Sequence, residues 1–163
     1  EYKAILEFCF ALGSFGQRAR RGYGSLHVEG IIWTTVGEYE KYLWELISNV
    51  SKLSRADFNN IANTPYPLLR GIWIGSAEQT SNEVLRKIGQ ASSVAKKHSQ
   101  SGEYRLGGVG RSRLASPLHA SVRKIDNVFY PVIAETRPKR DPHEEYVQQR
   151  NVFLRELGVD LNE

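Results

Sequence analysis

A short turn between two strand-like runs constrains the fold of this sequence more than any other feature. Residues 120–125 and 128–134 are rich in β-forming side chains, and Asp126 and Asn127 lie between them. Asp and Asn tolerate the tight backbone of a two-residue hairpin turn. Strands joined by so short a connection run antiparallel, so the pattern argues against a doubly wound parallel sheet.

Other segments predict further strands and helices. Residues 1–12 alternate in part and contain many β-formers, residues 26–33 predict a second strand, and residues 68–74 predict a buried strand. From Gly37 the apolar period changes to three and four residues, which indicates an amphipathic helix. A shorter helix is predicted after Ser54. The apolar positions of the helix that begins near Gly37 are Tyr39, Tyr42, Leu43, Leu46, Ile47 and Val50.

Two later helices carry signals at their ends. Thr80 and Glu83 have the spacing of a capping box, and cations at residues 96–98 suit the negative end of the helix that they would close. A last helix is predicted between Asp141, which can cap its start, and Gly158, which can close it. The apolar stripe of the earlier helix is Val84, Ile88, Ala91 and Ala95. We therefore expect an α+β fold, namely a ferredoxin-like (RNA-recognition-motif-like) antiparallel sheet with helices packed on one face.

Composition excludes several classes of protein. The 163 residues are 40% hydrophobic and 25% charged, enough to bury a core, and no run is apolar enough to span a membrane. No secretory signal is visible, and a single cysteine, Cys9, excludes an intrachain disulfide, so we expect a cytoplasmic protein. The absence of Met and the start at Glu1 predict a piece of a longer protein. Residues expected in the core are Cys9, Trp33, Trp44 and Trp73.

Positive charge is concentrated in the middle of the chain. Residues 86–124 hold nine basic side chains against Glu103 alone, a net charge of +8, while residues 1–85 carry −1 and residues 125–163 carry −3. Such a localised field concentrates polyanions, although a solvated surface face is an alternative interpretation.

Two loops combine glycine with arginine. In the first Gly/Arg loop, residues 13–25, glycines allow backbone amides to approach a phosphate, and Arg18, Arg20 and Arg21 could grip successive phosphates of one strand. The second Gly/Arg loop, residues 105–118, repeats this composition inside the +8 segment. Both loops favour binding to single-stranded RNA with little base preference. The candidate contacts from the second loop and its surroundings are Lys96, Lys97, Arg105, Arg111 and Arg113.

Signals for catalysis are weak. The histidines have no metal-ligand spacing, so we expect neither a metal nor another cofactor. His27 or His119, each close to an arginine-rich loop, could serve as the general base of a metal-independent endoribonuclease, which is the alternative function. A protein-binding module whose arginines dock an acidic surface is a third possibility.

These two loops resemble elements of the RAMP superfamily of CRISPR–Cas proteins. Residues 13–25 have the Gly-x-Arg-x-Arg-Arg-Gly-x-Gly-Ser character of its glycine-rich loop, and residues 113–118, with the hairpin after them, are similar to a second element. The chain looks most like the C-terminal portion of the first-numbered RAMP subunit of the type III-B (Cmr) effector complex. The resemblance covers most of the chain.

The resemblance implies a fold, a function and partners. Residues 1–35 would end a first ferredoxin-like domain and residues 36–163 would form a second. The chain would be a non-catalytic, RNA-binding subunit in antiviral defence, contacting guide RNA (crRNA) or target RNA beside neighbouring RAMP subunits, with no membrane partner. The residues to which the resemblance assigns RNA contacts are Gly13, Gly16, Gln17, Arg18, Arg20, Arg21, Gly22 and Gly24.

Overall fold

The structure is a computed structural model of the 163-residue chain. The residues that it describes are 2–14, 21–27, 30–51, 68–98, 106, 108–109, 113–114, 116–137 and 144–161.

A three-stranded antiparallel sheet forms the centre of the described fold. Its strands β1 (Leu68–Ile74), β4 (Leu118–Ile125) and β5 (Val128–Arg137) lie in the order β1-β5-β4. The predicted hairpin is confirmed: Ile125 pairs with Val128, and Asp126 takes a positive φ of 53° in the turn. Strand β1 pairs with β5 on the side opposite β4, which confirms the strand predicted over residues 68–74. The α+β class is therefore correct.

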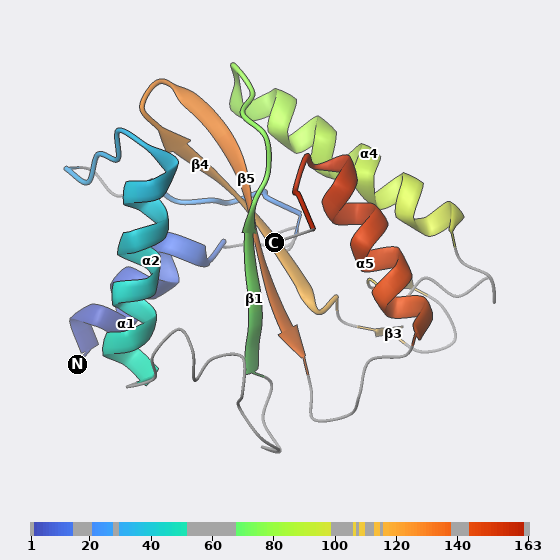
Figure 1. The fold of residues 1–163 in the computed structure, drawn as a ribbon, viewed down its shortest axis with the longest axis horizontal. Coiled ribbons are helices and arrows are strands. Elements are labelled where there is room, and N and C mark those ends of the chain that lie inside the picture. The colour runs from blue at the N-terminus through green and yellow to red at the C-terminus, as the bar shows by residue number, and fades with distance from the viewer. Residues whose placement is uncertain are drawn as a thin grey trace.

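Helices cover both faces of the sheet. Figure 1 shows the sheet nearly edge-on, with α1 (Tyr2–Leu12) and α2 (Val36–Ser51) on one side and α4 (Ser81–Lys97) and α5 (Glu144–Glu156) on the other. Successive β5 residues point to opposite faces, so Val132 enters the core beside α1 and α2 while Ile133 enters the core beside α4 and α5. The expectation of helices on one face is wrong, because both faces of the strands are apolar.

The helix ends predicted from local spacing are confirmed where the structure describes them. The Glu83 amide donates to Thr80 Oγ1 (3.2 Å), and the Thr80 amide donates to the Glu83 carboxylate (2.9 Å), which completes the capping box of α4. The whole predicted stripe of α4 is buried. After α5, Gly158 has a φ of +79° and ends the helix, as predicted. The proposed cap Asp141 lies outside the described residues.

Residues 2–12, the described part of the segment predicted as a strand over residues 1–12, do not form that strand. They form helix α1, because Phe8, Ala11 and Leu12 follow a spacing of three and four residues and pack into the core that α2 lines. The helix turns Cys9 outward, so the prediction that this thiol is buried is also wrong. In this segment, burial of the apolar side of a helix therefore outweighs the intrinsic preference of its residues for a strand.

The strand predicted over residues 26–33 is not present in residues 26–27 and 30–33, the part of this range that the structure describes. The described residues of this range form no ladder, and Trp33 instead packs in the core and accepts a hydrogen bond from the Asp126 amide at its carbonyl (2.7 Å). Trp33 is thus a core residue, as expected, whereas Trp44 and Trp73 are half-buried. The helix predicted after Ser54 lies outside the described residues.

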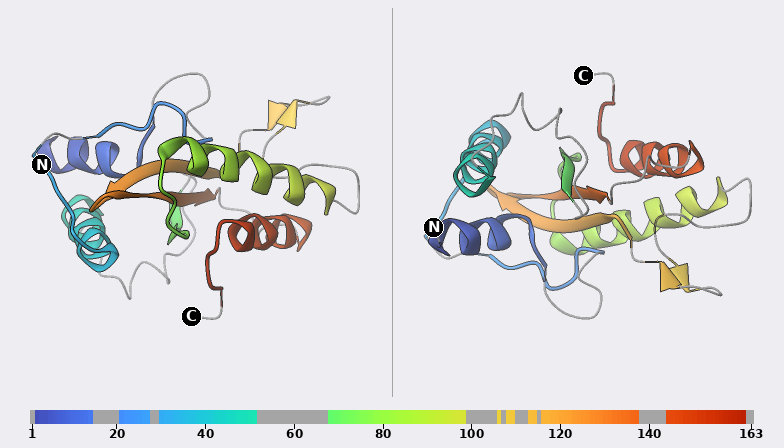
Figure 2. Two further views of the ribbon diagram at one scale, coloured as in Figure 1. Left: turned by 90° about the horizontal axis from the view of Figure 1, so that it is seen from above. Right: turned by 90° about the horizontal axis from the view of Figure 1, so that it is seen from below.

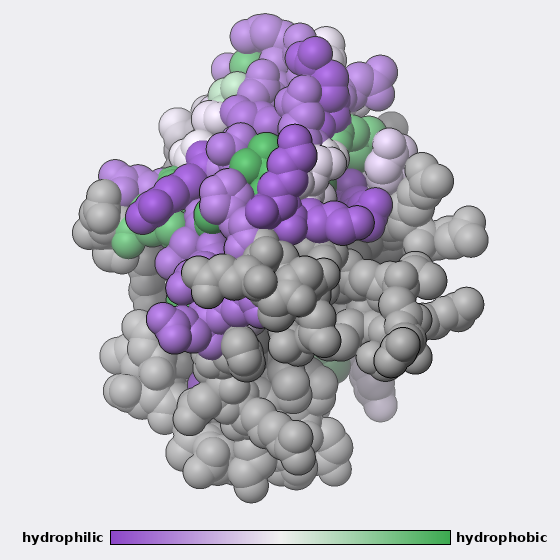
Figure 3. All heavy atoms as spheres, turned by 90° about the vertical axis from the view of Figure 1, so that its right-hand side faces the viewer, coloured by the Kyte–Doolittle hydropathy of each residue, from purple (hydrophilic) through white to green (hydrophobic). Residues whose placement is uncertain are grey.

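The described parts of residues 1–35 share one core with α2 and the sheet. Ala11, Leu12 and Trp33 lie against Tyr39 of α2 and Ile125 of β4. On the opposite side, Figure 3 shows that mostly hydrophilic residues cover the described surface of the α4 and α5 layer. Among the described residues, no helix is long and apolar enough to cross a membrane.

Candidate nucleic-acid interface

Both ends of the first Gly/Arg loop are attached to the outer edge of β4. Ser14 and Ser25 form a β-bridge with each other, and Arg21 forms one with Ala120. The Val122 amide donates to Ser25 Oγ (2.8 Å), and Ser25 Oγ donates to the Gly22 carbonyl (2.7 Å). In the described sheet, β4 has no strand on its outer side. The loop therefore provides hydrogen-bond partners for backbone groups on this edge of β4.

Arg123 fixes the same loop from within the protein. Its side chain is 3% exposed, and its guanidinium donates to the carbonyls of Phe10 (2.9 Å), Ala11 (2.6 Å) and Gly13 (2.8 Å) at the end of α1. It also reaches the Leu26 carbonyl (3.5 Å), beyond the other end of the loop. Carbonyls at a helix C-terminus lack partners within the helix, so a cation is favourable there.

Burial affects the ionisation of Arg123 and of a neighbouring tyrosine. Burial lowers the pKa of its guanidinium, and the nearby Tyr39 opposes that effect. Tyr39 is itself buried and donates its hydroxyl to the Ala11 carbonyl (2.8 Å). Burial raises the pKa of Tyr39 to about 12 although the Arg123 charge lowers it. Both side chains therefore hold the end of α1 rather than facing solvent.

The glycines of the first loop have different structural roles. Gly22 (φ +84°) is buried, and a Cβ there would lie 2.9 Å from Leu85 and 3.0 Å from Ile88. Only glycine combines this φ with such close packing under α4. Gly24 (φ +72°) is exposed and leaves its backbone accessible. Gly13 comes directly after α1, and its amide donates to the Cys9 carbonyl (2.7 Å).

The described parts of the two Gly/Arg loops lie on the same side of the molecule. Figure 2 shows residues 21–27 beyond β4, on the side that also carries the small hairpin of β2 (Gly108–Val109) and β3 (Arg113–Leu114). Arg21 is exposed there. Arg113 belongs to β3, and the predicted contacts outside the described residues are Gly16, Gln17, Arg18, Arg20, Arg105 and Arg111.

The +8 segment is less uniform on the surface than its sequence. Lys96 and Lys97 are exposed at the end of α4, and Arg86 and Lys124 are exposed as well. By contrast, Arg123 is buried. Among the same nine cations, Lys87 donates to Glu78 (2.7 Å) and to Ser76 (2.6 Å). A sum of charges cannot distinguish cations held by the fold from those that face solvent.

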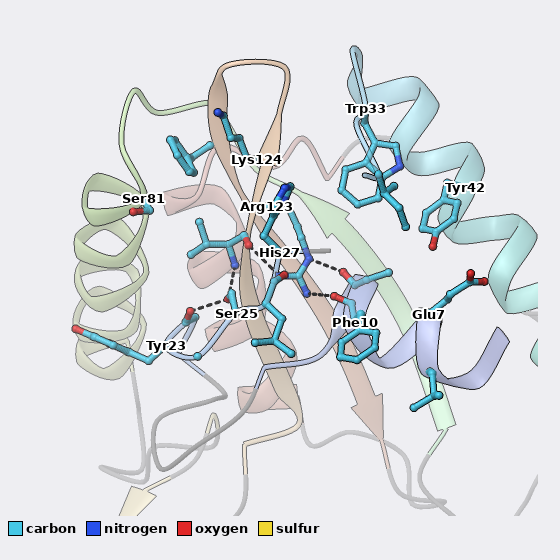
Figure 4. Close-up of a pocket in the computed structure, with 18 of the residues that line it drawn as sticks. Glu7, Phe10, Tyr23, Ser25, His27, Trp33, Tyr42, Ser81, Arg123 and Lys124 are labelled. Carbon is cyan, nitrogen blue, oxygen red and sulfur yellow. Dashed lines mark hydrogen bonds between the residues drawn. The ribbon is translucent and has the colours of Figure 1, made fainter. Parts of the chain in front are cut away.

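A cavity of about 670 Å³ opens beside the first Gly/Arg loop. Figure 4 shows Phe10 on α1, Tyr23 and His27 on the loop segment, Trp33, and Tyr42 on α2 around it. Trp33 and Tyr42 lie 5.5 Å apart between ring centroids. Burial and then the Glu7 charge raise the pKa of Tyr42. Sequence reasoning missed this cavity, because it depends on residues 2–12 forming a helix.

The two candidate general bases are not brought together. His27 lines the cavity, whereas His119 pairs with Ala134 in the β4–β5 ladder. His119 lies four residues before Arg123 on β4, about 13 Å along a strand. Within the described part of the chain there is no cluster of three or more side chains that could hold a metal ion.

A second polar cluster joins the sheet to α5. Glu135 is 1% exposed and accepts hydrogen bonds from the Tyr146 hydroxyl (2.7 Å) and from Arg150 (3.3 Å). The Arg150 guanidinium also lies 5.8 Å from the Trp73 ring centroid. These partners compensate a buried carboxylate and connect β5 to α5, so we interpret the cluster as structural.

Comparison with known proteins gives no assignment. No protein-family model matches this chain, and a search of curated proteins finds no significant match.

Proposed function

We propose that this chain binds single-stranded RNA as a non-catalytic, cytoplasmic subunit of a type III-B CRISPR effector complex. The proposal includes the ferredoxin-like form of the α+β fold, the division at residue 35 and neighbouring RAMP subunits as partners. Guide RNA, target RNA or both would lie along the two Gly/Arg loops.

One observation carries the RNA-binding part of the proposal. The described parts of both loops lie on the β4 side of the molecule, and the first loop is attached there at both ends. A loop with fixed ends loses less conformational freedom when a strand binds, which favours affinity. Exposed Arg21, Lys96, Lys97 and Lys124 supply charge-assisted contacts to phosphate.

The experiment compares salt dependence in two double variants. Fluorescence anisotropy of a labelled single-stranded RNA is measured at several salt concentrations with wild type, Arg18→Ala/Arg21→Ala and Lys41→Ala/Arg155→Ala. The control removes two exposed cations from α2 and α5, outside both loops. Each lost phosphate contact should flatten the log–log salt slope by about 0.7. We expect the loop variant to flatten it by about 1.4 and the control to leave it near the wild-type value.

Equal slopes for the loop variant and wild type would refute a phosphate-binding role of this loop. Incubation of wild type, His27→Ala and His119→Ala with the same RNA tests the alternative endoribonuclease function; of the two histidines, His27 lines the cavity next to the loop. Metal-free cleavage of the RNA by wild type that is lost in either histidine variant would replace the non-catalytic assignment. We expect intact RNA throughout.

A further inference from the structure

We propose that the cavity beside the first Gly/Arg loop receives one unstacked nucleobase of the bound RNA. The proposal rests on the proposed function, because the strand that supplies the base is held by the loop. It adds a base-binding subsite in this cavity to the phosphate contacts that the two loops predict.

The cavity has the size and lining of a ligand site. Its volume of about 670 Å³ lies within the range of about 300–1,000 Å³ that is usual for small-molecule pockets. Much of its wall is aromatic or aliphatic. Ser81 and His27 could meet a base edge, and the lining also includes the charged side chains of Glu7 and Arg123. Stacking on aromatic rings tolerates any base, since every base has a π-face.

The position of the cavity connects it to the phosphate-binding loop. Residues 22–27 form one wall, so the backbone that bears exposed Arg21 continues directly into the lining. Lys124 and Lys3 also line it and are exposed, and Lys3 forms an ion pair with Glu7, a further lining residue (3.8 Å). The exposed ammonium group of Lys124 beside an apolar interior suits a nucleotide, whose phosphate is charged and whose base is a flat ring.

Two exposed apolar side chains belong to the lining of the cavity, which is also consistent with stacking. Tyr23 is 47% exposed and Leu6 is 56% exposed, and both line the cavity. Ile5, on the same helix as Leu6 and 40% exposed, does not line it. Leu6 and Ile5 therefore allow a matched test, since a larger side chain at position 6 can obstruct the cavity and one at position 5 cannot.

The test compares an intact oligoribonucleotide with an abasic oligonucleotide of the same length. Anisotropy titrations are made at several salt concentrations. The ratio of the affinities for the intact and the abasic oligonucleotide gives the base preference, and the log–log salt slope gives the contribution of phosphate contacts. For wild type we expect about tenfold tighter binding of the intact RNA, the effect of about one stacked base. Leu6→Trp should remove this preference and leave the slope unchanged, while Ile5→Trp should keep both.

Tyr23→Ala provides a second variant that does not depend on how Leu6→Trp folds, and it should lower the preference severalfold. Circular dichroism checks the fold of each variant. Equal preference in wild type, Leu6→Trp and Tyr23→Ala would overturn the base-binding proposal while leaving phosphate binding intact. If wild type binds neither oligonucleotide, the proposed function itself is wrong. Leu6→Trp could also differ from wild type in its sedimentation coefficient while binding both oligonucleotides with wild-type affinity. That result would overturn the proposal and indicate that the cavity forms a contact between protein molecules.

Discussion

Replacement of Arg123 by methionine should destabilise the protein without acting as the loss of an RNA contact. Methionine has a similar length but no donor, so the carbonyls of Phe10 and Gly13 lose the guanidinium at 2.9 and 2.8 Å. The Ala11 carbonyl keeps the Tyr39 hydroxyl. The change removes a buried cation as well, which offsets part of the cost.

The magnitude can be worked out from the lost hydrogen bonds. The bonds to the Phe10 and Gly13 carbonyls are partly buried. The loss of the guanidinium donor costs about 1–3 kcal/mol for each of these carbonyls, and removal of the buried charge returns part of the sum, so we expect Arg123→Met to lower the free energy of unfolding by about 3 kcal/mol. With a urea dependence of about 2 kcal/mol per molar, the midpoint of unfolding should fall by about 1.5 M.

Equilibrium unfolding in urea, monitored by circular dichroism, measures this effect. Lys124→Met is the matched control, because its side chain is the next on β4 but is exposed, and it should change stability by no more than about 0.5 kcal/mol. Arg123→Lys should give an intermediate loss, since an ammonium group cannot reach the same spread of carbonyls. A wild-type midpoint for Arg123→Met would refute the structural role that we assign to this guanidinium.

Two further predictions concern glycine packing and alkaline stability. Gly22→Ala should destabilise by about 1–3 kcal/mol, because its φ of +84° and the contacts with Leu85 are unfavourable to a Cβ. Gly89→Ala should instead stabilise the protein by about 0.5–1 kcal/mol, since Gly89 lies in α4 with open space around the position of a Cβ. Urea unfolding measures both variants, and equal effects of the two substitutions would contradict this reasoning. The raised pKa of Tyr39, about 12 against 10.0, implies stability that is fully present below pH 10 and lost between about pH 10 and 12, up to about 3 kcal/mol. Tyr39→Phe should be less stable than wild type at pH 8, and the difference in urea midpoints should shrink towards pH 12; a constant difference would contradict this linkage.

The sequence predicted the elements whose signals are local. The Thr80 and Glu83 capping box, the buried stripe of α4 and the Asp126 turn each depend on residues within a few positions of one another. Such features arise from backbone geometry and spacing, so sequence patterns identify them without tertiary information.

Residues 1–12 were mispredicted for the opposite reason. Their β-forming composition favours a strand, and only the packing of Ala11 and Leu12 against Tyr39 selects the helix. Intrinsic β-propensity depends strongly on context, so the structure of a short segment of this kind is decided by its tertiary partners. The cavity lined by Leu6 and Phe10 could not be predicted either, because it exists only if this segment is helical.

Composition indicated which segments form the candidate interface, but it did not indicate the structural role of each residue in them. The count of positive charges in residues 86–124 includes Arg123, whereas the partners of this side chain are carbonyls up to 113 residues earlier in the chain. The resemblance assigns an RNA contact to Gly22, and the structure adds that this residue packs closely under α4. Contacts this distant leave no local signal in the sequence.

The long separation between Arg123 and the loop has a consequence for protein synthesis. Gly13 leaves the ribosome 110 residues before the guanidinium that holds its carbonyl, and Ser25 leaves 97 residues before the Val122 amide that it binds. A nascent chain therefore cannot fix either end of the first Gly/Arg loop until strand β4 has been translated and paired. Translation products that end before β4 would carry the first Gly/Arg loop without the contacts that attach its ends, so the proposed RNA recognition would require synthesis of the chain through β4.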